Sequence, residues 1–176
     1  YNGGGYLYIA SEVGYMVAGT TRTASKTFER LQFSDRRVAD TNDSESNTPF
    51  YNVTSGGDGT GTTGNAPLPT LNLGRVYVLA SPGTCSASEA VVNGLRGVGV
   101  EVILVGGTTW GKPYGFTAKD NCGISYFPIE FQGVNQLGFG DYANGFAPTA
   151  TCTVADDFSR ALGDSSEGML AAALNH

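Results

Sequence analysis

The sequence predicts an α/β fold that contains a short parallel sheet. Two apolar runs of strand length, "RVYVLA" at residues 75–80 and "VEVILVG" at residues 100–106, flank a helical pattern, "SASEAVVNGLRG", at residues 86–97. A strand, a helix and a strand within about 30 residues form a βαβ unit, whose two strands pair in parallel. An alternating segment at 123–131 and an amphipathic tail at 163–175 add a further strand and a further helix.

The chain before this unit predicts a helix, a strand and a long loop. Apolar residues recur at helical spacing from Leu7 to Val17, and "KTFERLQF" at 26–33 is typical of a strand. From Ser34 to Pro69 the chain is polar and rich in Gly, Thr, Asn and Ser. We expect residues 40–67 to be a mobile loop without secondary structure near the active-site cleft, because this composition buries little apolar surface.

The chain after the unit predicts a strand and a terminal helix. In "GISYFPIEF", 123–131, the side chains of Phe127, Ile129 and Phe131 share one face, and Pro128 favours an edge strand. The tail 163–175 has Asp164 as a helix cap and Glu167 three residues later, which is the pattern of a capping box.

Composition and charge exclude several classes of function. The 176 residues suit one domain with a sizeable core. A net charge of −6 without a basic cluster argues against a nucleic-acid partner, and no apolar run approaches the about 20 residues of a membrane span. The single histidine, His176, is the last residue, which nearly excludes a Ser-His-Asp triad, a Cys-His dyad and a zinc site with histidine ligands.

The segment "GGTTWGKP", residues 106–113, raises the question of what Lys112 does. Its glycine and lysine spacing is close to that of a phosphate-binding P-loop, which would need Ser or Thr in place of Pro113. Proline has no hydroxyl for magnesium and no N–H for phosphate, and no helical pattern follows. A nucleotide site is therefore disfavoured, and Lys112 is either a solvated loop residue or a functional amine.

The segment "TCSASE" places Ser86 between the end of a strand and the start of a helix. A turn at this point exposes the hydroxyl of a nucleophile, and the helix N-terminus favours developing negative charge. The amide of Ala87 would point outward, toward an oxyanion. The alternative is that Ser86 only caps the helix. Cys85 is a rival nucleophile, but with no histidine to activate it we interpret it as a small buried residue.

Ser86 and Lys112 follow the two strands of the predicted βαβ unit, 26 positions apart. The carboxyl edge of a parallel sheet is where ligands bind in open α/β folds. A neutral lysine serves as the base for a serine when burial disfavours its charge, and "VILVGG" and Trp110 would supply apolar surroundings. The residues alone therefore suggest a Ser-Lys dyad.

Four segments, in order, resemble the carboxyl-terminal processing peptidases, or tail-specific proteases. "YNGGG" resembles the end of their Asn-x-Gly-Gly segment, "SASE" their nucleophile motif, "GGTTWGKP" their Gly-x-x-Thr-x-Gly-Lys motif, and "NGFAPTATCTVADDFSRALG" their closing region. The match over about residues 76 to 112 is strongest, because two separate motifs have nearly the expected spacing. Residues 20–70 match no segment of the family.

The resemblance implies a fold and an activity. The fold would be that of the Clp protease and crotonase superfamily, with stacked ββα units. Ser86 would be the nucleophile and Lys112 the general base, with the amides of Gly4 and Ala87 as the oxyanion hole. The reaction would be hydrolysis of a protein or peptide substrate near its carboxyl terminus through an acyl-enzyme, with no cofactor and no metal.

The resemblance also implies how the chain is organised and where it works. Residues 1–176 would be part of a protease catalytic domain, without its N-terminal strand and without a PDZ-like module, so the isolated piece would be poorly active. The location would be the bacterial cell envelope, periplasmic or secreted. Because disulfides persist there, we expect a Cys122–Cys152 bond and a free Cys85. The sequence predicts no oligomeric state.

The chain departs from the family at Phe116, where many members carry a glutamine that orients the lysine. Another group would then orient Lys112, or activity would be weak. We interpret Glu89 as helix-start electrostatics rather than chemistry. Two alternative functions stay open: a ligand- or peptide-binding module on the same fold, similar to the retinoid-binding relatives, and a crotonase-like acyl-CoA enzyme, in which "SASE" and "GKP" would have no role.

Overall fold

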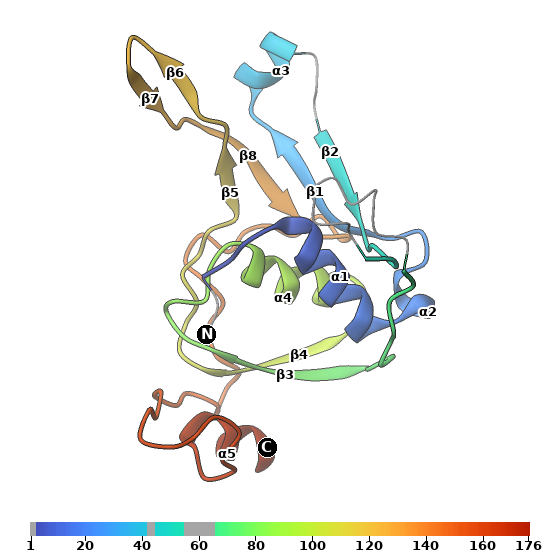
Figure 1. Ribbon diagram of the computed structural model, residues 1–176, viewed down its shortest axis with the longest axis vertical. Coiled ribbons are helices and arrows are strands. Elements are labelled where there is room, and N and C mark those ends of the chain that lie inside the picture. Colours follow the sequence, from blue (N-terminus) through green and yellow to red (C-terminus); the bar gives the residue numbers. More distant parts are fainter. Residues whose placement is uncertain (1–2, 42–44, 55–65) are drawn as a thin grey trace.

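The computed structural model of the chain describes residues 3–41, 45–54 and 66–176. An antiparallel sheet lies above two helices, a parallel pair of strands lies below them, and a last helix covers the lower side of that pair (Figure 1). In chain order the elements are α1 (Leu7–Ala18), α2 (Thr20–Thr23), β1 (Thr27–Phe33), α3 (Asp35–Thr41), β2 (Glu45–Pro49), β3 (Arg75–Ala80), α4 (Ala87–Gly97), β4 (Glu101–Gly106), β5 (Tyr114–Phe116), β6 (Lys119–Asn121), β7 (Ile124–Tyr126), β8 (Ile129–Val134) and α5 (Gly168–Leu174).

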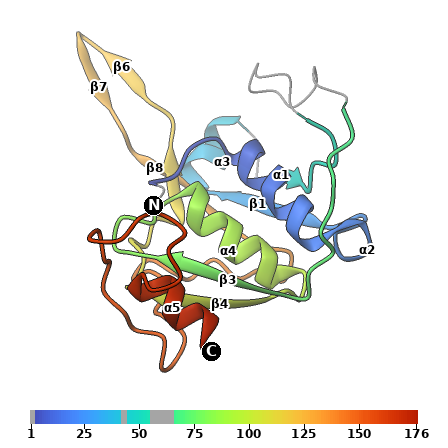
Figure 2. The ribbon, with the colours of Figure 1, turned by 60° about the horizontal axis from the view of Figure 1, so that its bottom comes forward.

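The predicted βαβ unit is present, and β3 pairs in parallel with β4 along its whole length. The two faces of β4 are both covered, which explains its continuous apolar run. Val102 and Leu104 pack in one cluster with residues of α4. Ile103 and Val105 pack in another cluster, on the face of the pair that α5 covers (Figure 2).

Phe28 of β1 joins the antiparallel sheet to the helical layer. Its side chain is buried and meets Phe50 edge to face. A Cβ on Gly14 of α1 would lie 3.1 Å from the Phe28 ring, and a Cβ on Gly94 of α4 only 2.6 Å from it. The two helical glycines therefore leave the space that this ring fills, which holds α1 and α4 against the sheet.

The antiparallel sheet has the order β2-β1-β8-β5, and it corrects two expectations. The segment expected to be a structureless loop contains β2, which pairs with β1 from Gln32–Glu45 to Thr27–Pro49. The polar sequence "ESNTP" forms this strand because its partner fixes it at the sheet edge. Residues 42–44 and 55–65 of the expected loop lie outside the described residues, so its mobility stays a prediction.

The second correction concerns residues 123–131, which form two strands rather than one. β7 ends at Tyr126 and β8 begins at Ile129, so Pro128 lies between them and withholds no ladder hydrogen bond. β8 is an interior strand, between β1 and β5. The pair β6–β7 forms a hairpin that projects away from the body (Figure 1).

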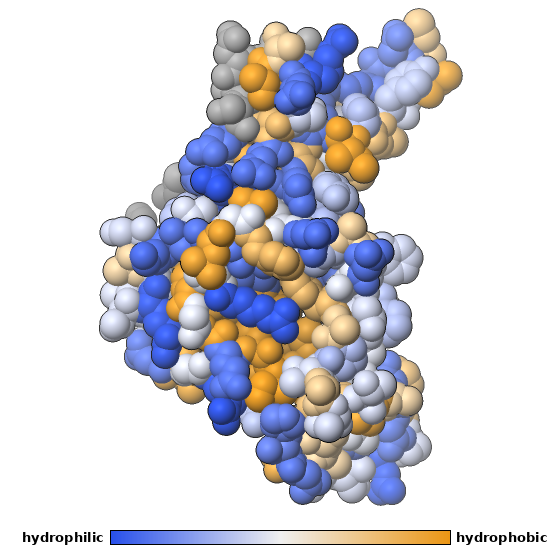
Figure 3. All heavy atoms as spheres, turned by 180° about the vertical axis from the view of Figure 1, so that it is seen from behind, coloured by the Kyte–Doolittle hydropathy of each residue, from blue (hydrophilic) through white to orange (hydrophobic). Residues whose placement is uncertain are grey.

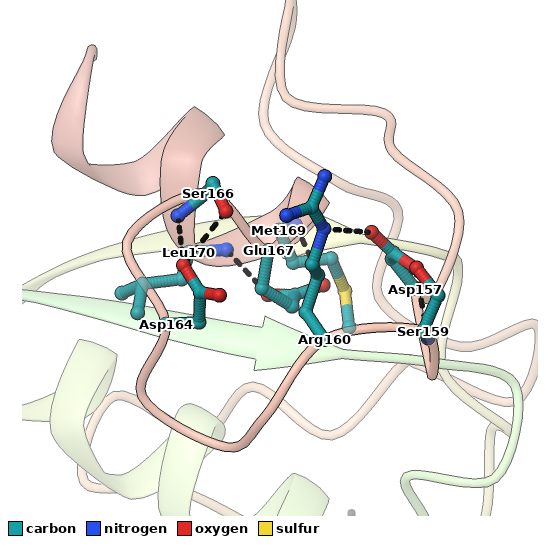
Figure 4. A network of polar contacts seen from close by, with 8 residues as sticks. All are labelled: Asp157, Ser159, Arg160, Asp164, Ser166, Glu167, Met169 and Leu170. Atoms are coloured by element: carbon teal, nitrogen blue, oxygen red, sulfur yellow. Dashed lines mark hydrogen bonds and ion pairs between the residues drawn. The ribbon is translucent and has the colours of Figure 1, made fainter.

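The terminal helix is present, but it begins later than expected. Glu167, not Asp164, is the cap of α5, and its carboxylate accepts hydrogen bonds from the amides of Met169 and Leu170 at 3.0 and 2.8 Å (Figure 4). Asp164 instead accepts from the amide and hydroxyl of Ser166, which closes a turn just before the helix. The predicted cap at Asp164 is therefore wrong: Asp164 closes the preceding turn, and Glu167 caps the helix.

The expected Cys122–Cys152 disulfide is wrong, and all three cysteines are free. Cys122 is exposed at the turn between β6 and β7, at the far end of the projecting hairpin. Cys152 is buried in the cluster with Ile103 and Val105, beneath the parallel pair. The two residues belong to opposite ends of the molecule, so the fold keeps their sulfur atoms apart.

In the part of the chain that the structure describes, no helix is long and apolar enough to cross a membrane. Seen from behind, hydrophobic residues gather in the middle of the molecule and hydrophilic residues cover much of the sheet region above it (Figure 3).

Candidate active site

Ser86 lies in the turn between β3 and α4, one residue before the helix begins. Its backbone has φ 57° and ψ −122°, a conformation that L residues rarely adopt and that costs on the order of 1–3 kcal/mol. Strain at a serine between a strand and a helix is what a nucleophile turn shows. A residue that only capped the helix would adopt an ordinary extended conformation.

Glu89 fastens this turn to the loop that carries Lys112. Its side chain is fully buried in the first turn of α4, and one carboxylate oxygen accepts from the Ser86 amide at 3.0 Å. The same carboxylate accepts from the hydroxyl of Thr109 at 2.6 Å and from the amides of Gly111 and Lys112 at 2.7 and 2.9 Å. The Glu89 carboxylate therefore hydrogen-bonds to both the "SASE" and the "GGTTWGKP" segments. This role goes beyond the predicted helix-start electrostatics.

Further hydrogen bonds hold the two loops after β3 and β4 together. The amide of Trp110 donates to the carbonyl of Thr84 at 2.9 Å. Thr109 exchanges hydrogen bonds with Phe146: its hydroxyl accepts from the Phe146 amide at 2.7 Å, and its own amide donates to the Phe146 carbonyl at 3.1 Å. The motif loop is thus fixed on two sides before any substrate binds.

Gly4 packs directly against Ser86. Its φ of +110° lies in the region that favours glycine. A Cβ at this position would stand 2.8 Å from the Cβ of Ser86 and 3.0 Å from the carbonyl oxygen of Cys85. Ala87, the first residue of α4, is buried beside them, and amides in a first helical turn have no partner within the helix. The two predicted oxyanion residues therefore flank Ser86.

Lys112, in the loop after β4, lines the same cavity as Ser86, but it is not buried among apolar residues as the sequence suggested. Its side chain is exposed, and Trp110, expected to help bury it, is 67% exposed. The Nζ atom lies 5.7 Å from the centroid of the Phe116 ring, a cation–π distance. Phe116 therefore contacts the amine through its ring face, where a glutamine would offer a hydrogen bond. These residues alone do not give Lys112 the apolar burial that the sequence suggested.

Ser86 and Lys112 line one cavity of about 280 Å³. No hydrogen bond joins the Ser86 hydroxyl to the Lys112 amine among the described residues. The walls combine the start of α4 with the antiparallel sheet, and further lining residues are Leu31, Pro113, Phe116 and Phe131. The parallel unit thus presents the two candidate catalytic groups, and the antiparallel sheet supplies the surface opposite them.

The cavity also contains two buried titratable residues that no sequence motif signals. Glu29 of β1 is 7% exposed, and burial raises the pKa of its carboxyl group to about 7. Tyr142 is 3% exposed, and burial, followed by the charges of Glu29 and Glu89, raises the pKa of its phenol. Both residues reach the cavity through strand pairing and loop packing, so their sequence neighbours give no sign of it.

Cys85 is the less suitable nucleophile of the two neighbours in the turn. Burial, and then the nearby charge of Glu89, raise the pKa of its thiol above the ordinary value, and the charge of Lys112 only partly opposes this. A thiol with a raised pKa is protonated at neutral pH and is a poor nucleophile. Cys85 is half-buried rather than buried as expected, and its thiol is not activated.

Comparison with known proteins identifies the fold. No protein-family model matches the chain, and no curated protein matches it. A crystal structure of a putative S41 protease from Bacteroides fragilis matches 99% of this chain at 26% identity with a TM-score of 0.75. The photosystem II D1 C-terminal processing protease matches 84% of the chain at 19% identity with a TM-score of 0.50, and so supports the fold alone.

These matches confirm the resemblance to C-terminal processing proteases. The chain has a mixed α/β fold that matches part of an S41 protease. It spans 42% of the Bacteroides fragilis chain and 31% of the D1 processing protease, less than half of either.

Proposed function

We propose that this chain carries the catalytic centre of a serine peptidase that hydrolyses proteins near their carboxyl termini, with Ser86 as nucleophile and Lys112 as general base. The observation that carries the proposal is that Glu89 holds the strained Ser86 turn and the Lys112 loop on one carboxylate, at the edge of one cavity. The overall match to an S41 protease structure supports the same reaction class.

The reaction starts when the Ser86 hydroxyl attacks the scissile carbonyl carbon and gives its proton to the neutral Lys112 amine. The carbonyl oxygen becomes an oxyanion, which the amides of Gly4 and Ala87 stabilise. When the C–N bond breaks, Lys112 returns the proton to the leaving nitrogen, and the acyl group remains on Ser86 as an ester. A water molecule, deprotonated by Lys112, then hydrolyses this ester and restores the serine.

The exposed position of Lys112 gives the substrate a part in this chemistry. A peptide in the cavity would cover the amine beside Phe116 and exclude water from it. Loss of water disfavours the charged form of an amine, and the neutral form is the one that acts as a base.

The proposal also includes a finer fold assignment and a location. The fold would have the stacked ββα units of the Clp protease and crotonase superfamily, and the protein would work in the bacterial cell envelope.

A fluorophosphonate probe tests the proposal on the full-length protein, with peptide mass spectrometry to locate the label. We expect labelling at Ser86, and loss of labelling in Ser86→Ala. Ser88→Ala is a matched control, because Ser88 is two residues further along the same helix start and we expect it to keep the label. A folded protein that shows no label at Ser86 while a known serine peptidase is labelled in parallel would overturn the proposal.

One observation favours a second candidate, a peptide-binding module without catalysis. Phe116 stands where many relatives orient the lysine, and the Lys112 amine is exposed over its ring. If the probe gives no label but a carboxyl-terminal peptide binds with a measurable Kd, this second candidate replaces the first.

A further inference from the structure

The cavity beside Ser86 holds a buried acid for which the reaction above has no use. Glu29 is more than nine-tenths buried, on β1, and lines the cavity together with Leu31 on the same face of the strand. Its carboxylate lies against Gly133 of β8, where a Cβ would stand 2.7 Å from the carboxyl carbon. The absence of a side chain at Gly133 therefore creates the space that this carboxylate fills.

No described residue neutralises this acid. Within the described residues, the Glu29 carboxylate accepts no hydrogen bond and makes no ion pair, and its raised pKa has desolvation as its cause. Lys112, a cation that lines the same cavity, lies over the Phe116 ring instead. A buried carboxylate without a partner is strongly unfavourable when it is charged. An unpaired carboxylate in a cavity wall indicates that a ligand supplies the hydrogen-bond donor or cation that pairs with it.

The position of the cavity indicates which part of a substrate enters it. The acyl carbon that Ser86 attacks is bonded to the Cα of the residue just before the scissile bond. That residue's side chain therefore starts beside Ser86, at the edge of the cavity. The walls are apolar, with Leu31, Phe131 and Phe116 among them, so they suit a hydrocarbon stem.

We propose that Glu29 selects a lysine or arginine side chain immediately before the scissile bond. This inference rests on the proposed peptidase function and names its substrate class. The stem of such a side chain would pack on the apolar walls, and its cationic end would pair with Glu29. A charged, fully desolvated pair of this kind discriminates strongly against analogues that lack the charge, because the carboxylate is then left unpaired.

Matched peptides test the pocket on the full-length protein. Two fluorogenic substrates would be identical except for lysine or norleucine before the scissile bond, since norleucine has the lysine stem without the amine. We expect kcat/KM to be at least about tenfold higher for the lysine peptide, and Glu29→Gln to lower this ratio by at least about tenfold. Equal kcat/KM values for the two peptides, or a ratio that Glu29→Gln leaves unchanged, would overturn the inference.

Glu130→Gln is the control variant for this experiment. Glu130 is also buried, on the neighbouring strand β8, but it pairs with Arg37 and Lys119 and does not line this cavity. We expect Glu130→Gln to keep the wild-type preference for lysine. A melting curve for each variant shows whether it is folded.

A binding measurement separates failure of this inference from failure of the peptidase function. n-Pentylammonium and n-pentanol carry the same stem with and without a charge, and NMR titration reports their Kd without any catalysis. We expect the ammonium to bind at least about tenfold more tightly to the wild type, and to lose this advantage in Glu29→Gln. If no peptide is cleaved but this difference is seen, the pocket is right and the catalytic proposal is wrong. If peptides are cleaved and the difference is absent, the pocket assignment is wrong.

Discussion

The parallel unit and the antiparallel sheet contribute to the site in different ways. The unit β3–α4–β4 has Ser86 and Lys112 at the ends of its two strands, and a single buried carboxylate, Glu89, fixes both loops. The sheet β2-β1-β8-β5 contributes a wall with a buried acid, Glu29, that has no partner among the described residues. The proposed reacting groups thus belong to loops that share one buried carboxylate, while the proposed selectivity group belongs to a sheet assembled from distant segments.

This difference teaches that rigidity and selectivity are divided between the two regions. The Glu89 carboxylate, which holds both loops, accepts four hydrogen bonds, so small changes there should disrupt the whole site. The wall has an acid without a partner, so changes there should alter preference and stability while the site stays assembled. The following experiments test this division, from the largest expected effect to the smallest.

The largest effect is expected from Lys112→Arg in the parallel unit. Arginine keeps the positive charge but does not give up its proton, so it cannot act as a base. We expect kcat/KM for peptide cleavage to fall by about 10³-fold or more while the melting temperature changes little. Lys119→Arg is the control, because Lys119 lies on β6 and contacts Glu130 at 3.6 Å. Near-wild-type cleavage by a folded Lys112→Arg protein would rule out Lys112 as the base for Ser86.

Glu89→Gln should give the largest loss of stability. The side-chain amide can accept fewer of the four hydrogen bonds from Ser86, Thr109, Gly111 and Lys112, and its own N–H groups oppose these donors. We expect the free energy of unfolding to fall by about 3 kcal/mol, measured by urea denaturation. Glu101→Gln, an exposed partner of Arg75, should change it by no more than about 1 kcal/mol. Equal losses for both variants would mean that Glu89 does not organise the site.

Glu29→Gln should have the opposite sign and should depend on pH. Burial raises the Glu29 pKa from 4.5 to about 7. Below about pH 4.5 the carboxyl group is protonated in both the folded and unfolded states and costs nothing. Between these values only the unfolded state releases its proton, so wild-type stability falls as pH rises, and above about pH 7 the full cost remains.

Apart from a constant offset, Glu29→Gln should therefore gain stability relative to wild type between pH 4.5 and 7, by up to about 3 kcal/mol. Urea denaturation at several pH values measures this difference. A difference that is the same at pH 4 and pH 8 would show that Glu29 is not the buried, unpaired acid described above.

The smallest effect is expected from the free cysteines. Cys122 is exposed on the hairpin, so it should react with a thiol reagent in the native state, whereas Cys152 should react only after unfolding. Three thiols should titrate in denaturant without a reducing agent. Cys122→Ser should change the free energy of unfolding by less than about 0.5 kcal/mol, as expected for an exposed side chain with no buried contacts. If only one thiol titrates, Cys122 and Cys152 form a disulfide and the prediction is wrong.

The same division explains what the sequence could and could not predict. The parallel unit was predicted with nearly correct bounds, because its apolar runs and helical pattern are local signals and both faces of β4 are buried. β2 was missed because its polar residues show no strand pattern, and among the described strands it pairs with β1 alone. The break at Pro128 was misread as an edge, since alternation continues across the two strands on either side of it.

The sequence also predicted some residues of the candidate site and missed others. Ser86 and Lys112 were predicted to lie at the same sheet edge because both follow parallel strands, and both line one cavity. Their catalytic roles stay a prediction. Glu89 was predicted as a helix-start charge, which accounts for its bond to the Ser86 amide but not for its bonds to the loop after β4. Glu29 could not be found from its neighbours, because Gly133 and Tyr142 reach it only through the tertiary fold.

The bonds of Glu89 also determine when during biosynthesis the centre comes into existence. Its partners lie before and after β4, so the serine turn and the lysine loop take up their places only once the ribosome has released both strands and they have paired. A nascent or misfolded copy would have the two residues in its chain but no assembled centre. In the proposed peptidase, a chain would therefore gain its catalytic centre only after it has folded.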